Sequence, residues 1–202
     1  MRLLISGFEP WHDPVNPAWE VAKALPKAHA GCELRSVLLR VAAADAERAL
    51  RESIESFEPD AVVLLGQSGR SQQLEVERIA VNLDDYRVED NDGALVVNRP
   101  IEAGAPDGLF ATLPVVEMVS AIRGAGVPAA LSLTAGTHLC NHMLYWALRY
   151  AQRNRPGMMC GFIHLPFLPE QLLRKGSGCC MSGELMLRGV LSAIEAIGEY
   201  AR

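Results

Sequence analysis

Compact hydrophobic runs alternate along the chain with stretches in which apolar residues recur every three or four positions. Residues 2–6 and 60–66 are two such runs, each about as long as a buried strand and each bounded by a glycine. Between them, residues 43–57 carry apolar side chains at the spacing of an amphipathic helix. The alternation predicts strands and helices in turn, the pattern of an α/β protein.

The same criteria locate the remaining elements. Additional strands are predicted at residues 33–41, 74–83, 94–97, 128–133 and 158–165. Additional helices are predicted at residues 16–25, 110–123, 137–153 and 182–200. The stretch 98–109 is rich in proline, glycine and acidic residues and is predicted to be a surface loop.

These elements predict one domain, residues 1–202, folded as a three-layer α/β/α sandwich around a mixed, mostly parallel sheet. No internal repeat and no long linker divides the chain. Open α/β sheets bind ligands beyond the carboxyl ends of their strands. Four positions are expected at such ends and could converge on one pocket: Gly7, Gly66, Gly136 and His164.

Charge and cysteine content narrow the classes of function. The net charge is −5 and the 19 basic residues are scattered, so no nucleic-acid partner is expected. No apolar run reaches the roughly 18 residues of a membrane-spanning helix, so no membrane partner is expected. The glycines form no nucleotide-binding motif. The five cysteines include no pair with metal-ligand spacing, which indicates a reduced, cytoplasmic protein.

The segment around Cys140 suggests a nucleophile. Residues 131–142 predict a short strand, a tight turn at Gly136 and the first turn of a helix. A thiol at a helix start is favoured in its thiolate form, which is the nucleophile. His164 at the end of another strand and Glu77 on a third would complete a Cys–His–acid triad.

Each of these residues also has a plainer interpretation. Taken alone, Cys140 is more often a small core residue, and His164 a hydrogen-bonded structural histidine. Glu77 alone is more often a solvated or ion-paired strand residue. His142, two positions after Cys140 on the same helix, is expected to face away from the site and to be structural, whereas His138 could line it.

Several motifs in order resemble one known family along essentially the whole chain. They are Gly7-Phe8-Glu9-Pro10, Asn16-Pro17, Gly66-Gln67-Ser68-Gly69-Arg70, Glu77 to Asn82, Asp84-Asp85 with Arg87, Ser132 to His142, and Phe162 to Gln171. In these segments the chain resembles pyroglutamyl-peptidase I, a family of cytoplasmic cysteine peptidases.

The resemblance implies removal of an N-terminal pyroglutamyl residue from peptides, without a metal or cofactor, by an enzyme that is often a homodimer or homotetramer. It implies catalysis by Cys140, His164 and Glu77. It also implies substrate-binding roles for a further set: Phe8, Trp11, Asn16, Gln67, Arg87 and Leu139, with Arg87 near the reacting carbonyl.

The chain departs from the family pattern in one loop. Relatives carry Phe-Gly-Gly where this chain has Trp11-His12-Asp13, which should change the path of the loop. A non-catalytic protein that binds a lactam or a peptide is therefore one alternative. A hydrolase of another cyclic amide is a second.

Overall fold

The computed structural model describes all residues from 1 to 202 and contains strands and helices in alternation. The strands are β1 (Arg2–Phe8), β2 (Ala28–His29), β3 (Cys32–Leu39), β4 (Ala61–Gln67), β5 (Leu74–Glu77), β6 (Ile79–Val81), β7 (Gly108–Phe110), β8 (Ala129–Ser132) and β9 (Met159–Leu165). The helices are α1 (Pro17–Ala24), α2 (Ala43–Phe57), α3 (Val115–Gly124), α4 (Leu139–Asn154), α5 (Pro169–Lys175) and α6 (Gly183–Tyr200). None of the helices is both long and apolar enough to span a membrane.

Seven strands form the central sheet in the order β2-β3-β1-β4-β9-β5-β8. Strands β3, β1, β4 and β9 run parallel, whereas β5 pairs with β9 in the antiparallel sense and β8 follows β5. The sheet is therefore mixed and mostly parallel, as predicted. The reversal at β5 places Glu77 opposite Phe162, in the middle of β9, and this removes the carboxylate from the water at the edge of the sheet.

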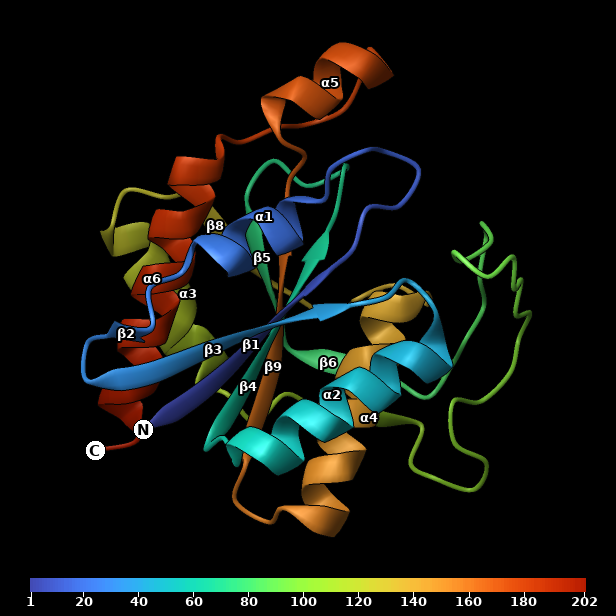
Figure 1. The fold of residues 1–202 in the computed structure, drawn as a ribbon, viewed down its shortest axis with the longest axis horizontal. Coiled ribbons are helices and arrows are strands. Elements are labelled where there is room, and N and C mark those ends of the chain that lie inside the picture. Colours follow the sequence, from blue (N-terminus) through green and yellow to red (C-terminus); the bar gives the residue numbers. More distant parts are fainter.

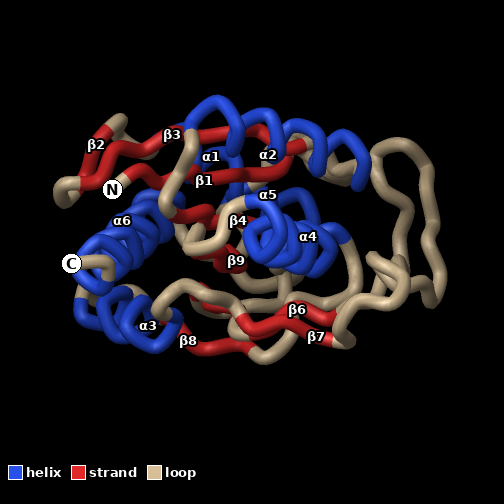
Figure 2. The backbone as a smooth tube through the Cα atoms, turned by 90° about the horizontal axis from the view of Figure 1, so that it is seen from below, coloured by secondary structure: helices blue, strands red, loops and turns tan.

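Helices cover both faces of the sheet and give the predicted three layers (Figures 1 and 2). On one face α1, α3 and α6 pack over a core of 29 buried residues. On the other face α2 and α4 pack over a second core of 23 buried residues. The short helix α5 lies outside these layers, beyond the carboxyl ends of the parallel strands (Figure 1).

Some predicted elements differ from the observed ones. The single strand predicted at 74–83 is broken at Arg78, and its second half pairs with β7 in a separate two-stranded sheet. The stretch 94–97 forms no strand. Its Leu95 and Val97 are 52% and 62% exposed, so this short apolar run lacks the burial that stabilises a strand.

Helix boundaries differ for local reasons. The helix predicted from residue 110 starts only at Val115, because Pro114 disfavours helical backbone in the residue before it. Helix α5 was not predicted, although Pro169 at its first position and Gly176 at its end, with φ of 73°, are ordinary helix signals. Its seven residues are too few to show a clear helical period.

Candidate active site

Cys140 lies in the first turn of α4, as the sequence predicts. The chain leaves β8, turns at Gly136 with φ of 78°, and enters the helix at Leu139. The first backbone N–H groups of any α-helix have no partner within the helix, and here the residue before the helix, His138, provides no side-chain cap for them. Cys140 is partly exposed and therefore feels both the helix dipole and solvent.

Gly66 leaves the space that the sulfur occupies. A Cβ at position 66 would lie 3.0 Å from Sγ of Cys140 and 2.4 Å from the ring of Phe162. Any side chain at the end of β4 would therefore push against both groups. The glycine that the sequence offers as the end of a buried strand has a steric function next to the thiol.

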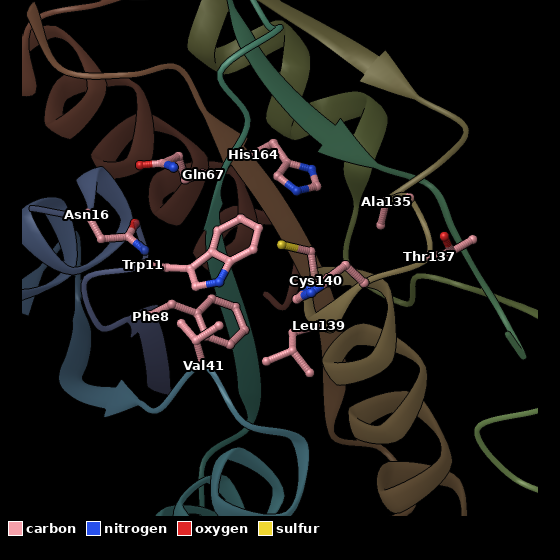
Figure 3. Close-up of a pocket in the computed structure, with 12 residues that line it drawn as sticks. Phe8, Trp11, Asn16, Val41, Gln67, Ala135, Thr137, Leu139, Cys140 and His164 are labelled. Carbon is pink, nitrogen blue, oxygen red and sulfur yellow. The ribbon is translucent and has the colours of Figure 1, made fainter. Parts of the chain in front are cut away.

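His164 and Glu77 are hydrogen-bonded neighbours on adjacent strands. His164 is on β9 and Glu77 on β5, and Nδ1 of the imidazole lies 2.7 Å from Oε1 of the carboxylate. Glu77 is fully buried and its Oε2 has no partner. Because an ionised carboxylate can only accept, Nδ1 carries a proton and Nε2 is left for other chemistry. Figure 3 shows the His164 ring and the sulfur of Cys140 facing one another.

The charge state of His164 is set by these two neighbours. Burial alone would lower its pKa, but the charge on Cys140, the hydrogen bond to it and the bond to Glu77 outweigh burial and raise the pKa to about 10. The imidazole therefore keeps its second proton at neutral pH. A protonated imidazole beside a thiolate is the ground state of an activated cysteine.

The sulfur and the imidazole open into a cavity of about 200 Å³ (Figure 3). It is lined by Phe8, Trp11, Asn16, Val41, Gln67, Ala135, Gly136, Thr137, His138, Leu139, Cys140 and His164. Phe8, Gln67 and His164 lie at or next to the carboxyl ends of the parallel strands β1, β4 and β9. Gly136 does not come from the carboxyl end of such a strand. Strand β8 is antiparallel to β9, and the loop that follows β8 returns to the cavity.

The predicted substrate-binding residues separate into two groups. Five of them line the cavity: Phe8, Trp11, Asn16, Gln67 and Leu139. Arg87 is exposed and lies outside this lining, so its role stays a prediction. Sequence reasoning missed Val41, which follows the carboxyl end of β3, the position that the strand-end rule should have selected.

The aromatic wall of the cavity includes His138. Its ring lies 5.1 Å from Trp11 and 4.2 Å from Tyr86, measured between ring centroids. Its Nε2 lies 3.0 Å from the carbonyl oxygen of Val88. A carbonyl only accepts, so Nε2 carries the proton and Nδ1 is left as an acceptor. Burial lowers the pKa of His138, which keeps the ring neutral near pH 7.

His142 faces away from the cavity and is held between two carboxylates. Nδ1 lies 2.8 Å from Oδ2 of Asp84, and Nε2 lies 2.8 Å from Oε1 of Glu47. Burial would lower the pKa of His142, but the two hydrogen bonds and charges raise it to about 9. The neighbouring Asn141 bonds the backbone of Val81. Together they tie the first turns of α4 to the 81–84 segment.

The other cysteines differ from Cys140 in environment. All five are free thiols. Cys32 and Cys160 are buried in the core, and burial raises the pKa of Cys160 to about 12, which makes it a poor nucleophile at neutral pH. Cys179 and Cys180 lie between α5 and α6, outside the cavity lining.

One group of side chains could in principle approach a metal ion. It comprises Glu75, Glu77 and His164, whose ligand atoms lie within 4.8 Å of one another. The metal would compete with the proton shared by His164 and Glu77, because Nδ1 is already engaged there. The hydrogen bond accounts for the approach of His164 to Glu77.

Comparisons with known proteins identify the family of this chain. The family model described as pyroglutamyl peptidase matches residues 1–200. The pyrrolidone-carboxylate peptidase of Streptococcus suis strain 05ZYH33 is 43% identical over 201 residues, which are 99% of this chain and 94% of the relative. The protein of the same name from Streptococcus pyogenes serotype M4 is 40% identical with the same coverage.

Solved structures extend the likeness to the fold. Pyroglutamyl peptidase I of Bacillus amyloliquefaciens superposes with a TM-score of 0.94 at 33% identity, covering 98% of this chain and 97% of that one. A mutant pyrrolidone carboxyl peptidase from the hyperthermophile Pyrococcus furiosus superposes with a TM-score of 0.95 at 34% identity, covering 100% of both chains. With a family model that spans nearly its whole length, this chain belongs to the pyroglutamyl peptidase family.

Proposed function

We propose that the protein is a cysteine exopeptidase that hydrolyses the amide bond after an N-terminal pyroglutamyl residue. The observation that carries the proposal is the arrangement of Cys140 and His164, which line one cavity while Glu77 binds the far nitrogen of the imidazole. Nucleophile, acid–base group and orienting carboxylate are thus in the order that acyl transfer needs. Membership in the family supports the choice of substrate.

In the first half of the reaction, the thiolate of Cys140 attacks the carbonyl carbon that joins pyroglutamate to the next residue. The electron pair of the C=O bond moves to oxygen, where the free N–H groups at the start of α4 stabilise the charge. Nε2 of His164 then gives its proton to the amide nitrogen. The C–N bond breaks, the shortened peptide leaves, and a pyroglutamyl thioester remains.

In the second half, water replaces the departed amine. His164 takes a proton from the water through Nε2, and the oxygen attacks the thioester carbonyl. The C–S bond breaks, pyroglutamic acid leaves, and the thiolate–imidazolium pair is restored. Throughout, Glu77 keeps the ring oriented and balances its positive charge.

The chemistry of the cavity supports selection of a lactam. A pyroglutamyl ring is small and uncharged, and it carries one N–H donor and one carbonyl acceptor. Phe8 and Trp11 offer apolar faces to the ring, and Gln67 and Asn16 offer polar groups. An ordinary peptide N-terminus carries an ammonium group, and burying that charge without a partner is strongly unfavourable. Unblocked peptides are therefore rejected.

Three further parts of the proposal concern the surroundings of the site. Arg87, exposed on the loop beside Tyr86, would add positive charge near the reacting carbonyl once substrate is bound. The enzyme would act in the cytoplasm, where five free thiols stay reduced. It would assemble as a homodimer or homotetramer, like other members of its family.

The decisive assay compares pyroglutamyl-, prolyl- and glutamyl-arylamides under reducing conditions. Only the first should be cleaved, and Cys140→Ala should abolish that cleavage while the unfolding transition stays unchanged. Binding of free pyroglutamate without any turnover would support a lactam-binding protein instead. Cleavage of prolyl-arylamide at a comparable rate would contradict the assigned specificity.

A further inference from the structure

Gln171 is a fully buried amide that does not line the cavity but contacts a residue that does. It is the third residue of α5 and is 0% exposed. Its Oε1 accepts from the N–H of Leu168 at 2.9 Å. Its Nε2 donates to the carbonyl of Val15 at 3.2 Å and to Oε1 of Gln67 at 2.8 Å. One side chain therefore connects three segments that are distant in sequence.

Two backbone groups fix which way the amide of Gln171 points. The N–H of Leu168 can only donate, and the carbonyl of Val15 can only accept. Rotating the amide of Gln171 by 180° would oppose donor to donor and acceptor to acceptor. Both backbone groups would then lose their partners, which is unfavourable in a site with little access to water. The second hydrogen of Nε2 is consequently always directed at Gln67.

The orientation is passed on to Gln67, the last residue of β4. Only the oxygen of its amide can accept from Gln171, so Oε1 is engaged there and the NH₂ group is the free end. Figure 3 shows this oxygen on the side away from Cys140 and His164. Asn16 is fixed in a similar way, since its Oδ1 accepts from Ala18 and its Nδ2 donates to Glu9.

We propose that Gln171 is a positioning residue for substrate recognition. It holds Gln67 with its N–H donors toward the cavity, so that this wall offers a donor to the ring carbonyl of the pyroglutamyl group. The identity of the ring rests on the proposed function, whereas the orientation of the two amides rests on the hydrogen bonds alone. A donor wall also disfavours the ammonium of an unblocked N-terminus, which has nothing to accept with.

A purely structural role for Gln171 makes a different prediction. Gln171 reaches back to the backbone of Leu168 as the third residue of a capping box does, and this contact stabilises the start of α5. Gln171→Glu keeps an acceptor for Leu168 but has no donor for Gln67 or for the carbonyl of Val15. Gln67 must then turn its NH₂ group toward the new carboxylate and present its oxygen to the substrate carbonyl. Gln171→Met removes the cap and leaves Gln67 free to rotate.

The two roles therefore rank the two variants in opposite order. If Gln171 positions Gln67, Gln171→Met raises KM for a pyroglutamyl-arylamide by about 3- to 10-fold with a smaller change in kcat, the size of one lost neutral hydrogen bond. Gln171→Glu raises KM further. If Gln171 only caps α5, Gln171→Glu is the milder variant, and that order would overturn the proposal. Gln72→Met, an exposed glutamine in the loop after β4, is the matched control and should leave KM unchanged.

A double-mutant cycle decides the question even where Gln171→Glu does not fold. In a Gln67→Met background there is no amide left to orient, so adding Gln171→Met should change KM no further. Effects that multiply across the cycle would show that Gln171 acts independently of Gln67. Calorimetry with free pyroglutamate repeats the cycle without turnover. A wild-type protein that binds pyroglutamate but cleaves nothing would therefore refute the proposed function and still test Gln171.

Discussion

Two buried imidazoles of this protein have similar charge states and different tasks. His164 and His142 each bond a carboxylate through Nδ1, and each has a raised pKa, about 10 and about 9 respectively. They differ at the second nitrogen. Nε2 of His142 binds Glu47, whereas Nε2 of His164 is turned to a thiol in an open cavity. A raised pKa therefore does not separate the two histidines; what distinguishes His164 is a second ring nitrogen that meets a thiol in an open cavity.

The largest effect in this comparison is expected for the second nitrogen of His164. His164→Gln removes the group that protonates the leaving amine and activates water, so kcat should fall by about 10⁴-fold or more. The measurement is turnover of a pyroglutamyl-arylamide by a variant whose unfolding transition has been checked. If the variant retained about 10% of the wild-type kcat, His164 would not be the acid–base group.

A smaller effect is expected at the carboxylate that holds His164. Glu77→Gln keeps an oxygen for Nδ1 but loses the negative charge that stabilises the imidazolium. The fall in kcat should be about 10- to 100-fold less severe than that of His164→Gln. The pH profile of kcat/KM should also shift, because the pKa of His164 falls without Glu77. An unchanged profile would contradict the assigned orienting role.

The corresponding change at the other imidazole should affect stability instead of turnover. His142→Gln leaves Asp84 and Glu47 near one another without a cation between them. Breaking such a buried arrangement costs about 3 kcal/mol of unfolding free energy. Denaturant titration measures that loss, and kinetics on the folded fraction should give a kcat near wild type. A collapse of kcat with intact folding would place His142 in the catalytic machinery.

The pH dependence of stability gives the smallest and most specific contrast. The pKa of His142 rises from 6.5 to about 9 on folding. A raised pKa stabilises the fold fully below the unfolded value, and that stabilisation is lost as pH rises through the folded value. The unfolding free energy of the wild type should therefore drop between about pH 6.5 and pH 9.

Comparing the wild type with His142→Gln isolates the contribution of His142. The variant should show a shallower decline over the same pH window, because the contribution of His142 is missing from it. Urea unfolding at the two ends of the window provides both slopes. Equal slopes in the two proteins would mean that His142 is not charged in the folded state.

The parts of the site that depend on local sequence were predictable. The strand, glycine turn and helix start around Cys140 are encoded within twelve consecutive residues, and strand ends are marked by glycine at Gly66 and by periodicity at His164. The family resemblance then selected Glu77 among the acidic residues of its segment. In the structure, Glu77 is the carboxylate that is hydrogen-bonded to His164.

Features set by tertiary contacts were not predictable. The break at Arg78 sends one apolar run into two sheets, and nothing within that run marks the place. Strand β5 runs antiparallel to β9, and this direction depends on how the whole sheet assembles and not on the residues of β5 alone. His142 was expected to be structural, but its bond to Glu47 joins residues 95 apart in sequence. The role of Gln171 likewise depends on Val15, 156 residues away.

The backbone ladder between β5 and β9 also aligns two parts of the proposed triad. Because side chains alternate along a strand, sliding one strand by a single residue would turn Glu77 to the opposite face and away from His164. Both residues lie on strands of the central sheet, so their alignment does not depend on the loops around the cavity. The carboxylate and the imidazole therefore stay aligned until the central sheet itself unfolds.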